Sequence, residues 1–293
     1  MLKFLLFTVL FASVSCSWTD DLINLFTPSK RIAREENQGN ARVIGGEDAP
    51  EHIPYQISMQ YKRGNSGAGN PLFPFLGIFN QQDSNNNQSQ TKWSHFCGGS
   101  VLNENHIVTA AHCVDGMNIS RMSIFAGESD LRNEDKGSRH LIESCVIHPD
   151  YVELNNSDVA VCKLQTSFPK SEKIQPIPLD KTYVGGGENC MLSGWGYTTR
   201  IKGAPLPNKL QRANFTSLTN EECNQRGHSV GNKEICAYKF SKGACNGDSG
   251  GPLQCNNVLV GIVSYGTAIC GLTVPDVYTR ASEFVDWINE NSN

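Results

Sequence analysis

Residues 247–252 read Gly-Asp-Ser-Gly-Gly-Pro, which places a serine hydroxyl among glycines and directly after a carboxylate. A serine hydroxyl is a weak nucleophile unless a neighbouring base removes its proton. A candidate base, His112, lies far upstream in residues 109–113, Thr-Ala-Ala-His-Cys. Asp158, in residues 156–161 (Asn-Ser-Asp-Val-Ala-Val), could orient that base. The three segments together predict nucleophilic catalysis by Ser249, with His112 and Asp158 in support.

These motifs, in the chain order His, Asp, Ser, resemble those of the trypsin/chymotrypsin-like serine proteases. Subtilisins and α/β-hydrolases carry the same residue types in other orders. The resemblance covers residues 43 to about 289. It implies an all-β fold of two antiparallel six-stranded β-barrels, with the active site between them and a C-terminal helix. His112 and Asp158 would come from the first barrel and Ser249 from the second.

The resemblance also implies a role for each residue. His112 would act as general base and then as general acid, while Asp158 would hold its imidazole in the productive tautomer. Ser249 would attack the substrate carbonyl and form an acyl-enzyme. The backbone N–H groups of Gly247 and Ser249 would form the oxyanion hole, where one donor is typically worth ~3 kcal/mol. This chemistry needs no cofactor and no metal.

The distribution of apolar residues independently indicates β-structure. Short apolar runs, such as residues 56–59, 107–109 and 258–264, recur between clusters of Gly, Asn and Pro, as in barrels and sandwiches. One helix is expected, at the C-terminus, with Ser282 as its N-cap. Its apolar face would consist of Phe284, Val285, Trp287 and Ile288.

The start of the chain resembles a targeting signal. Lys3 provides a positive charge, residues 4–12 are apolar, and Val14 and Cys16 suit cleavage after Cys16. We therefore expect a signal peptide at residues 1–16 and a secreted, extracellular protein. No other segment is long and apolar enough to span a membrane.

The remaining chain divides into a propeptide and one catalytic region. Residues 17–42 are polar, lack cysteine and read as a propeptide, followed by a peptidase domain at 43–293. The first barrel would occupy residues 43–175 and the second barrel residues 176–293.

Residues 42–46, Arg-Val-Ile-Gly-Gly, resemble the activation site of the family. Cleavage after Arg42 by a trypsin-like protease would free the ammonium group of Val43. That group would be buried against Asp248, because an unpaired buried carboxylate costs several kcal/mol. The resulting ion pair would order the oxyanion hole and the specificity pocket, so the precursor is expected to be a zymogen.

The chain has eleven cysteines, of which ten remain if Cys16 leaves with the signal peptide. An even number in a secreted chain indicates disulfides. Zinc is disfavoured, because the sequence contains no Cys-x-x-Cys pair and no histidine cluster. We predict that Cys145 and Cys162, which the family pattern does not require, form a fifth disulfide, and two buried free thiols are the alternative. The pairs that the resemblance implies are Cys97–Cys113, Cys190–Cys255, Cys223–Cys236 and Cys245–Cys270.

Three residues are expected to set specificity. Family members that require a basic side chain place Asp six residues before the nucleophile, where this chain has Gly243. Gly266 would leave the pocket open to bulky rings, which predicts cleavage after large apolar residues. Asp276 would enter from the opposite wall and allow secondary cleavage after Arg and Lys, a pattern that resembles arthropod chymotrypsins and crustacean collagenases. Alternatively, Asp276 hydrogen-bonds to nearby backbone and only shapes the pocket.

Residues 62–92 form an unusually long connection, rich in Gly, Pro, Asn and Gln, between two expected strands. Loops longer than about 12–15 residues are uncommon and are often functional or disordered. We expect this insertion to affect the binding of large partners more than catalysis on small substrates.

The charge balance excludes several classes of partner. Residues 43–293 carry 20 Lys and Arg against 25 Asp and Glu, a net charge of −5, which does not suit nucleic acid or heparin. The acidic stretch 128–135 could form a calcium loop through Glu128, Asp130, Glu134 and Asp135, although a solvated turn is favoured.

These features predict a secreted, monomeric zymogen of a chymotrypsin-like serine endopeptidase. Its partners would be protein and peptide substrates, an activating trypsin-like protease and protein protease inhibitors. The plain architecture favours a digestive role. The alternative is a catalytically inactive homologue that acts as a binding or signalling protein.

Overall fold

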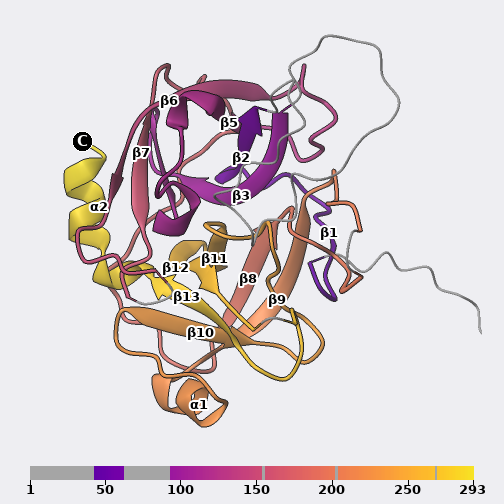
Figure 1. The fold of residues 1–293 in the computed structure, drawn as a ribbon, viewed down its shortest axis with the longest axis vertical. Coiled ribbons are helices and arrows are strands. Elements are labelled where there is room, and N and C mark those ends of the chain that lie inside the picture. Colours follow the sequence, from indigo (N-terminus) through magenta and orange to yellow (C-terminus); the bar gives the residue numbers. More distant parts are fainter. Residues whose placement is uncertain (1–42, 63–92, 154–155, 202–203, 268) are drawn as a thin grey trace, which may run out of the picture. The chain divides into compact units, whose positions relative to one another are not determined.

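The computed structural model describes residues 43–62, 93–153, 156–201, 204–267 and 269–293. The predicted signal peptide, propeptide and Arg42 lie outside the described residues, as does the insertion from residue 63 to residue 92. The described chain forms two antiparallel β-barrels (Figure 1), as the sequence predicts.

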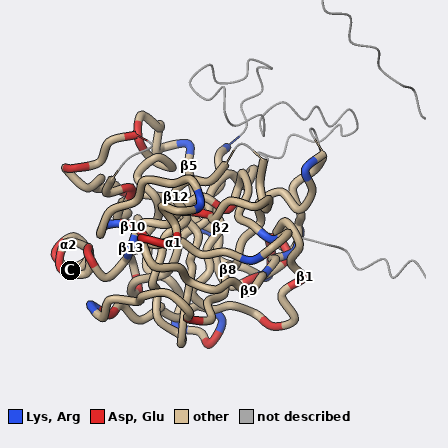
Figure 2. Tube along the Cα trace, turned by 90° about the horizontal axis from the view of Figure 1, so that it is seen from below, with Lys and Arg blue, Asp and Glu red and all other residues tan. Residues whose placement is uncertain are grey.

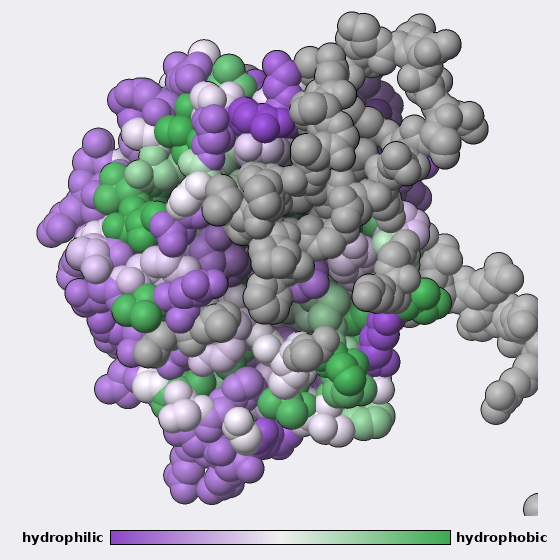
Figure 3. Space-filling view, in the orientation of Figure 1, coloured by the Kyte–Doolittle hydropathy of each residue, from purple (hydrophilic) through white to green (hydrophobic). Residues whose placement is uncertain are grey.

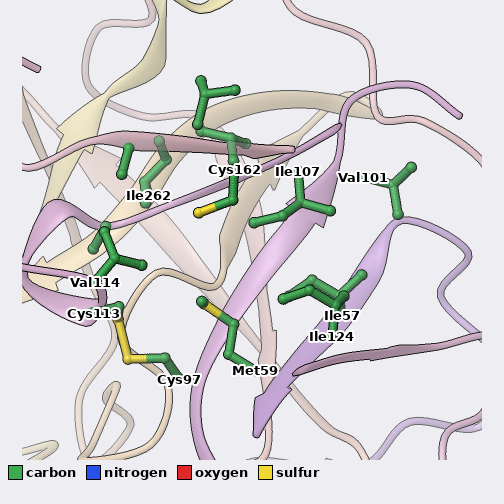
Figure 4. Close-up of a cluster of buried hydrophobic side chains, with 14 of the residues drawn as sticks. Ile57, Met59, Cys97, Val101, Ile107, Cys113, Val114, Ile124, Cys162 and Ile262 are labelled. Carbon is green, nitrogen blue, oxygen red and sulfur yellow. A yellow bond between two sulfur atoms is a disulfide. The ribbon is translucent and has the colours of Figure 1, made fainter. Parts of the chain in front are cut away.

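The first barrel closes in the strand order β2-β3-β4-β7-β6-β5. Alternate residues of β2, among them Ile57 and Met59, point into its core together with Ile107 and Ile124 from neighbouring strands (Figure 4). The other face of β2 is also buried: Ser193 Oγ of the second barrel donates to Gln56 Oε1 at 2.6 Å. The strands are β2 (Gln56–Lys62), β3 (Trp93–Val101), β4 (His106–Thr109), β5 (Met122–Ala126), β6 (Ser138–Ile147) and β7 (Ala160–Leu164).

The second barrel has the order β9-β10-β13-β12-β11-β8, and pairing of β8 with β9 closes it. A short extra strand, β1 (Glu47–Asp48), adds to the edge of β9. The six barrel strands are β8 (Asn189–Gly194), β9 (Gln211–Leu218), β10 (Glu234–Tyr238), β11 (Pro252–Cys255), β12 (Val258–Tyr265) and β13 (Asp276–Arg280).

Each end of the described chain packs against the barrel formed by the other half of the sequence. At the N-terminal end, Glu47 pairs with Arg212 of the second barrel. At the C-terminal end, α2 (Val285–Asn291) packs on the first barrel (Figure 1). Phe284 and Ile288 are buried in the core cluster of the first barrel, and the Phe284 ring lies 5.1 Å from that of His148.

The C-terminal helix is present, but its predicted start is wrong. Ser282 lies in a 3-10 turn, η5 (Ala281–Glu283), and its buried hydroxyl has no partner among the described residues. Phe284 occupies the N-cap position and makes no side-chain cap. Burial of the apolar face of the helix in the first barrel therefore decides where it begins, rather than N-cap preference.

A second helix, α1 (Asn220–Gln225), was not predicted from the sequence. Thr219 and Glu222 form a capping box at its start, in which each side chain bonds to the backbone of the other residue. Neither helix in the described part of the chain has the length and apolar character needed to cross a lipid bilayer.

Five disulfides link the described strands and loops, and their pairings are those expected from the sequence. Cys145 and Cys162 occupy directly paired positions on β6 and β7 and are bonded to each other, so the alternative of two free thiols is wrong. The other bonds are Cys97–Cys113, Cys190–Cys255, Cys223–Cys236 and Cys245–Cys270.

Charged and apolar side chains are mixed over the described surface. Lys and Arg are interspersed with Asp and Glu over the described chain (Figure 2), and the face in Figure 3 shows small separate apolar patches among hydrophilic residues.

Candidate active site

His112 and Asp158 form a tight pair at the boundary of the barrels. His112 lies in the 3-10 helix η3 (Ala111–Cys113) that follows β4, and the Cys97–Cys113 disulfide ties this turn to β3. Its Nδ1 lies 2.7 Å from Asp158 Oδ2, and its backbone N–H donates to Oδ1 at 3.0 Å. Because an ionised carboxylate can only accept, Nδ1 carries the proton and Nε2 is left as the basic nitrogen.

Two residues of the second barrel support Asp158. Ser264 Oγ, in β12, donates to Asp158 Oδ2 at 2.6 Å, and Thr279 Oγ1, in β13, donates to the Asp158 carbonyl at 2.8 Å. Neither contact could be predicted from the sequence, because each residue lies more than 100 residues from Asp158 and no local motif marks it.

The pair shifts both pKa values towards the charged forms. Burial lowers the pKa of His112, but the charge and hydrogen bond of Asp158 outweigh it, so the net pKa is raised. Burial raises the pKa of Asp158, but His112 and the hydrogen bond from Ser264 outweigh this, so the net pKa is lowered. Asp158 therefore stays ionised and stabilises an imidazolium beside it.

The Ser249 turn is held against both barrels. The Ser249 carbonyl accepts from the N–H of Gly98 in β3 at 2.7 Å. Gly250 has a φ of 75° and donates to the carbonyl of Val263, the residue before Ser264, at 2.8 Å. A Cβ on Gly250 would lie 2.1 Å from Thr109 Oγ1, so only glycine lets this turn approach the segment that leads into His112.

The described residues contain no hydrogen bond between Ser249 Oγ and His112. Such bonds are often long without substrate and shorten when substrate binds. The structure thus brings the His112–Asp158 pair and the Ser249 turn into one region.

Two backbone N–H groups of the Ser249 turn make no hydrogen bond within the described part of the chain. Neither the N–H of Gly247 nor that of Ser249 has an acceptor in the described part of the chain, whereas that of Asp248 donates to the Cys245 carbonyl at 2.8 Å. Gly247 has a φ of 101°, a conformation that favours glycine. Within the described residues the turn therefore has two unpaired N–H donors, one on each side of the Asp248 N–H, which is already hydrogen-bonded.

A buried histidine fixes the Gly247 peptide. His95 Nε2 donates to the Gly247 carbonyl at 2.8 Å, and Nδ1 lies 2.8 Å from Ser58 Oγ. Burial lowers the pKa of His95 to about 4, so its ring is neutral at physiological pH. His95 was not predicted from the sequence, since a lone histidine in a strand carries no distinctive signal.

Asp248 is fully buried without a cationic side chain. Its carboxylate accepts from the N–H groups of Gly196 at 2.8 Å and Cys245 at 3.0 Å, and no Lys, Arg or His among the described residues lies within ion-pair distance. Burial raises the pKa of Asp248 to about 7. Val43 is also fully buried in the second barrel, and the next residue, Ile44, accepts from the N–H of Gly243 at 3.1 Å.

The three predicted pocket residues lie together. A Cβ on Gly243 would be 3.2 Å from Asp276 Oδ2, and one on Gly266 would be 3.0 Å from Oδ1. Asp276 Oδ2 accepts from the Ala244 N–H at 2.7 Å, whereas Oδ1 accepts no hydrogen bond from the described residues. The nearby Tyr278 hydroxyl is buried and likewise has no partner there.

Asp276 gives a prediction for stability. Burial, aided by the charge of Asp248, raises the pKa of Asp276 to about 7, well above the value near 4 expected in the unfolded chain. The unfolded chain then holds fewer protons between these values, so stability falls as pH rises through this range. Asp276→Asn has no carboxyl group to ionise in this range. Its advantage over wild type in the free energy of unfolding should therefore grow by about 2 kcal/mol from pH 5 to pH 8.

Urea unfolding of both proteins, in a Ser249→Ala background that prevents self-digestion, measures this difference. Parallel pH profiles for the two proteins would contradict it.

Two groups of potential metal ligands in the described part of the chain are already engaged in other contacts. Cys97, Cys113 and His112 lie close together, but the disulfide occupies both sulfur atoms. In the acidic stretch considered for calcium, Asp130 pairs with Arg132 and Glu134 with Arg139.

Two barrels that enclose a His–Asp pair and a serine turn define the architecture of a serine endopeptidase. The model of the trypsin family matches residues 76–288. Trypsin II-P29 of Gallus gallus is 33% identical over 255 residues, covering 85% of this chain and 88% of its own. Chymotrypsin-2 of Vespa crabro is 30% identical, covering 85% and 99%. The solved structure of neuropsin, a serine protease from mouse brain, superposes with a TM-score of 0.67 at 25% identity, covering 85% and 99%.

The chain therefore belongs to the trypsin family of serine proteases.

Proposed function

We propose that Ser249, His112 and Asp158 carry out peptide-bond hydrolysis in this chain. The main support for this proposal is the 2.7 Å contact between His112 Nδ1 and Asp158 Oδ2, with the Ser249 turn anchored in the same region. His112 Nε2 takes the Ser249 proton as Oγ attacks the carbonyl carbon, and then delivers it to the leaving amine. Water then attacks the acyl-enzyme and gives a proton to His112. His112 passes that proton to Ser249 Oγ as the acyl group leaves.

The negative oxygen formed in each attack needs donors. The unpartnered N–H groups of Gly247 and Ser249 supply them, and His95 keeps the Gly247 peptide in place through its carbonyl. Removal of one such donor typically costs ~3 kcal/mol in the transition state.

An organophosphonate tests this assignment, because it reacts with an activated serine. Mass spectrometry should find the label on Ser249, and His112→Ala should abolish labelling. A folded, processed chain that takes no label would instead support the inactive homologue that acts as a binding or signalling protein.

We propose further that the protein is secreted as a zymogen and activated by a trypsin-like protease that cleaves after Arg42. Asp248 supports this, because a buried carboxylate without a counter-charge is costly and the new Val43 ammonium would supply one. The burial of Val43 and the contact between Ile44 and Gly243 also support it. Five disulfides suit an oxidising extracellular compartment.

For specificity, we propose cleavage after large apolar residues, with secondary cleavage after Arg and Lys. The uncharged Gly243 and the open position at Gly266 support the first preference. The free Oδ1 of Asp276 supports the second, although its Oδ2 bond to Ala244 also shapes the pocket. Likeness to relatives named trypsin and chymotrypsin favours a digestive role. We further propose that the enzyme is monomeric and that protein protease inhibitors bind it.

Asp276→Gly should lower kcat/KM for Arg and Lys substrates by about ten- to hundredfold, because a charge-assisted hydrogen bond is worth about 1.5–3 kcal/mol. Phe and Leu substrates should change by less than about threefold, since their side chains cannot use the carboxylate. A matched series of short amide substrates measures both classes.

Asp276→Asn separates loss of charge from loss of shape, because it retains one acceptor for the Ala244 N–H while a neutral amide replaces the carboxylate. Equal losses on apolar and basic substrates would contradict dual specificity. A wild-type preference for Arg over Phe would contradict the chymotrypsin-like assignment.

A further inference from the structure

One lysine of the second barrel bridges to the segment that carries Asp158. Lys233, directly before β10, donates from Nζ to Ser157 Oγ and to Asp150 Oδ2, both at 3.1 Å. Both acceptors belong to the connection between β6 and β7 of the first barrel. The contact therefore joins the two barrels one residue away from Asp158.

Ser157 has an unusual backbone conformation. Its φ is 64°, in the left-handed region, which costs a residue other than glycine roughly 1–2 kcal/mol. Its side chain is buried, and its hydroxyl bonds to Lys233. The Val159 N–H donates back to the Ser157 carbonyl at 2.8 Å, which closes a tight turn around Asp158. Rotation of Ser157 would therefore turn Asp158 away from His112.

Asp158 is thus held at three points by the second barrel. Ser264 fixes its carboxylate, Thr279 fixes its carbonyl, and Lys233 fixes the residue before it. The Lys233–Asp150 ion pair adds little by itself, because 40% and 65% of these side chains are exposed. The bond to the buried Ser157 hydroxyl is the contact that restrains the turn.

We infer that Lys233 is a positioning residue for catalysis, which acts through Ser157 to hold Asp158 against His112. This rests on the proposed function of that pair. Lys233 contacts none of the reacting groups, so its effect should appear in the rate of the chemical step and not in substrate binding.

Kinetics of the activated enzyme on a short amide substrate test the inference. Lys233→Met should lower kcat by about three- to tenfold with KM unchanged, the range expected for one lost hydrogen bond. Lys233→Arg, which keeps the donors, should restore most of the rate.

Substitution of the two acceptors separates their roles. Ser157→Ala should match the loss of Lys233→Met, while Asp150→Asn should stay near wild type. The double variant Lys233→Met/Ser157→Ala should lose no more than either single variant, because both remove the same contact.

Lys163→Met is the matched control. Lys163 forms an ion pair with Glu143 at 3.0 Å in the first barrel, with comparably exposed side chains, and has no contact with Ser157. A second measurement, the NMR resonance of the His112 Nδ1 proton in the folded enzyme, should shift or broaden in Lys233→Met and not in Lys163→Met.

Unchanged kcat and an unchanged Nδ1 resonance in Lys233→Met would overturn the inference, as would a loss confined to KM or equal to that of Lys163→Met. If Lys233→Met is too unstable to purify, Lys233→Arg and Ser157→Ala decide the question by the same two measurements. A wild-type enzyme that takes no organophosphonate label contradicts the proposed function itself, and the Nδ1 resonance then still tests the contact.

Discussion

Ser249→Ala is expected to lower kcat on peptide substrates by at least about 10⁴-fold, the largest effect of any substitution considered. Alanine has no hydroxyl to attack the carbonyl, and neither His112 nor the backbone N–H groups of Gly247 and Ser249 can replace it. Because the members of such a site act as a unit, Ser249→Ala/His112→Ala should lose little more than Ser249→Ala alone. Stopped assays on activated, purified protein measure the loss.

Ser282→Ala is a suitable control, since its hydroxyl makes no hydrogen bond among the described residues. It should retain wild-type activity. Retention of more than one per cent of wild-type activity by folded Ser249→Ala would mean that another group is the nucleophile.

Arg42→Gln should leave the secreted precursor at least about a hundredfold less active than the cleaved wild type. Without cleavage no Val43 ammonium forms, and an uncompensated buried charge such as Asp248 costs about 3–5 kcal/mol. Limited trypsin should activate the wild-type precursor and generate the N-terminus Val-Ile-Gly-Gly, but should not activate Arg42→Gln.

Arg226→Gln is the control, because it removes an exposed arginine, and with it a possible trypsin site, elsewhere in the second barrel. Its precursor should be activated normally. An Arg42→Gln precursor as active as the cleaved enzyme would refute the zymogen proposal.

The residues proposed for the chemistry could be named from the sequence, while their supports could not. His112, Asp158 and Ser249 each sit in a distinctive local motif. Ser264, Thr279 and Lys233 are common residue types whose partners lie across the barrel boundary, so only the folded chain reveals their contacts. A hydrogen bond to a distant carbonyl or hydroxyl leaves no periodicity to detect.

The helices illustrate two different errors. The start of α2 was misplaced because Ser282 has a strong N-cap preference, yet packing of Phe284 and Ile288 into the first barrel outweighs it. In contrast, α1 carries a readable signal, since Thr219 and Glu222 have the spacing of a capping box. The helix is short enough for its apolar periodicity to be lost among neighbouring strand residues.

The exchange of terminal segments between the barrels bears on how the protein emerges from the ribosome. All six strands of the first barrel are made once Leu164 is synthesised, but the helix that covers its core is the last element to appear. Conversely, Glu47 is synthesised early, but its hydrogen-bond partner Arg212 follows only 165 residues later. Neither half of the nascent chain can therefore finish folding alone, and Asp158 gains Ser264 and Thr279 only near the end of translation. An unfinished polypeptide therefore lacks both of these restraints on Asp158.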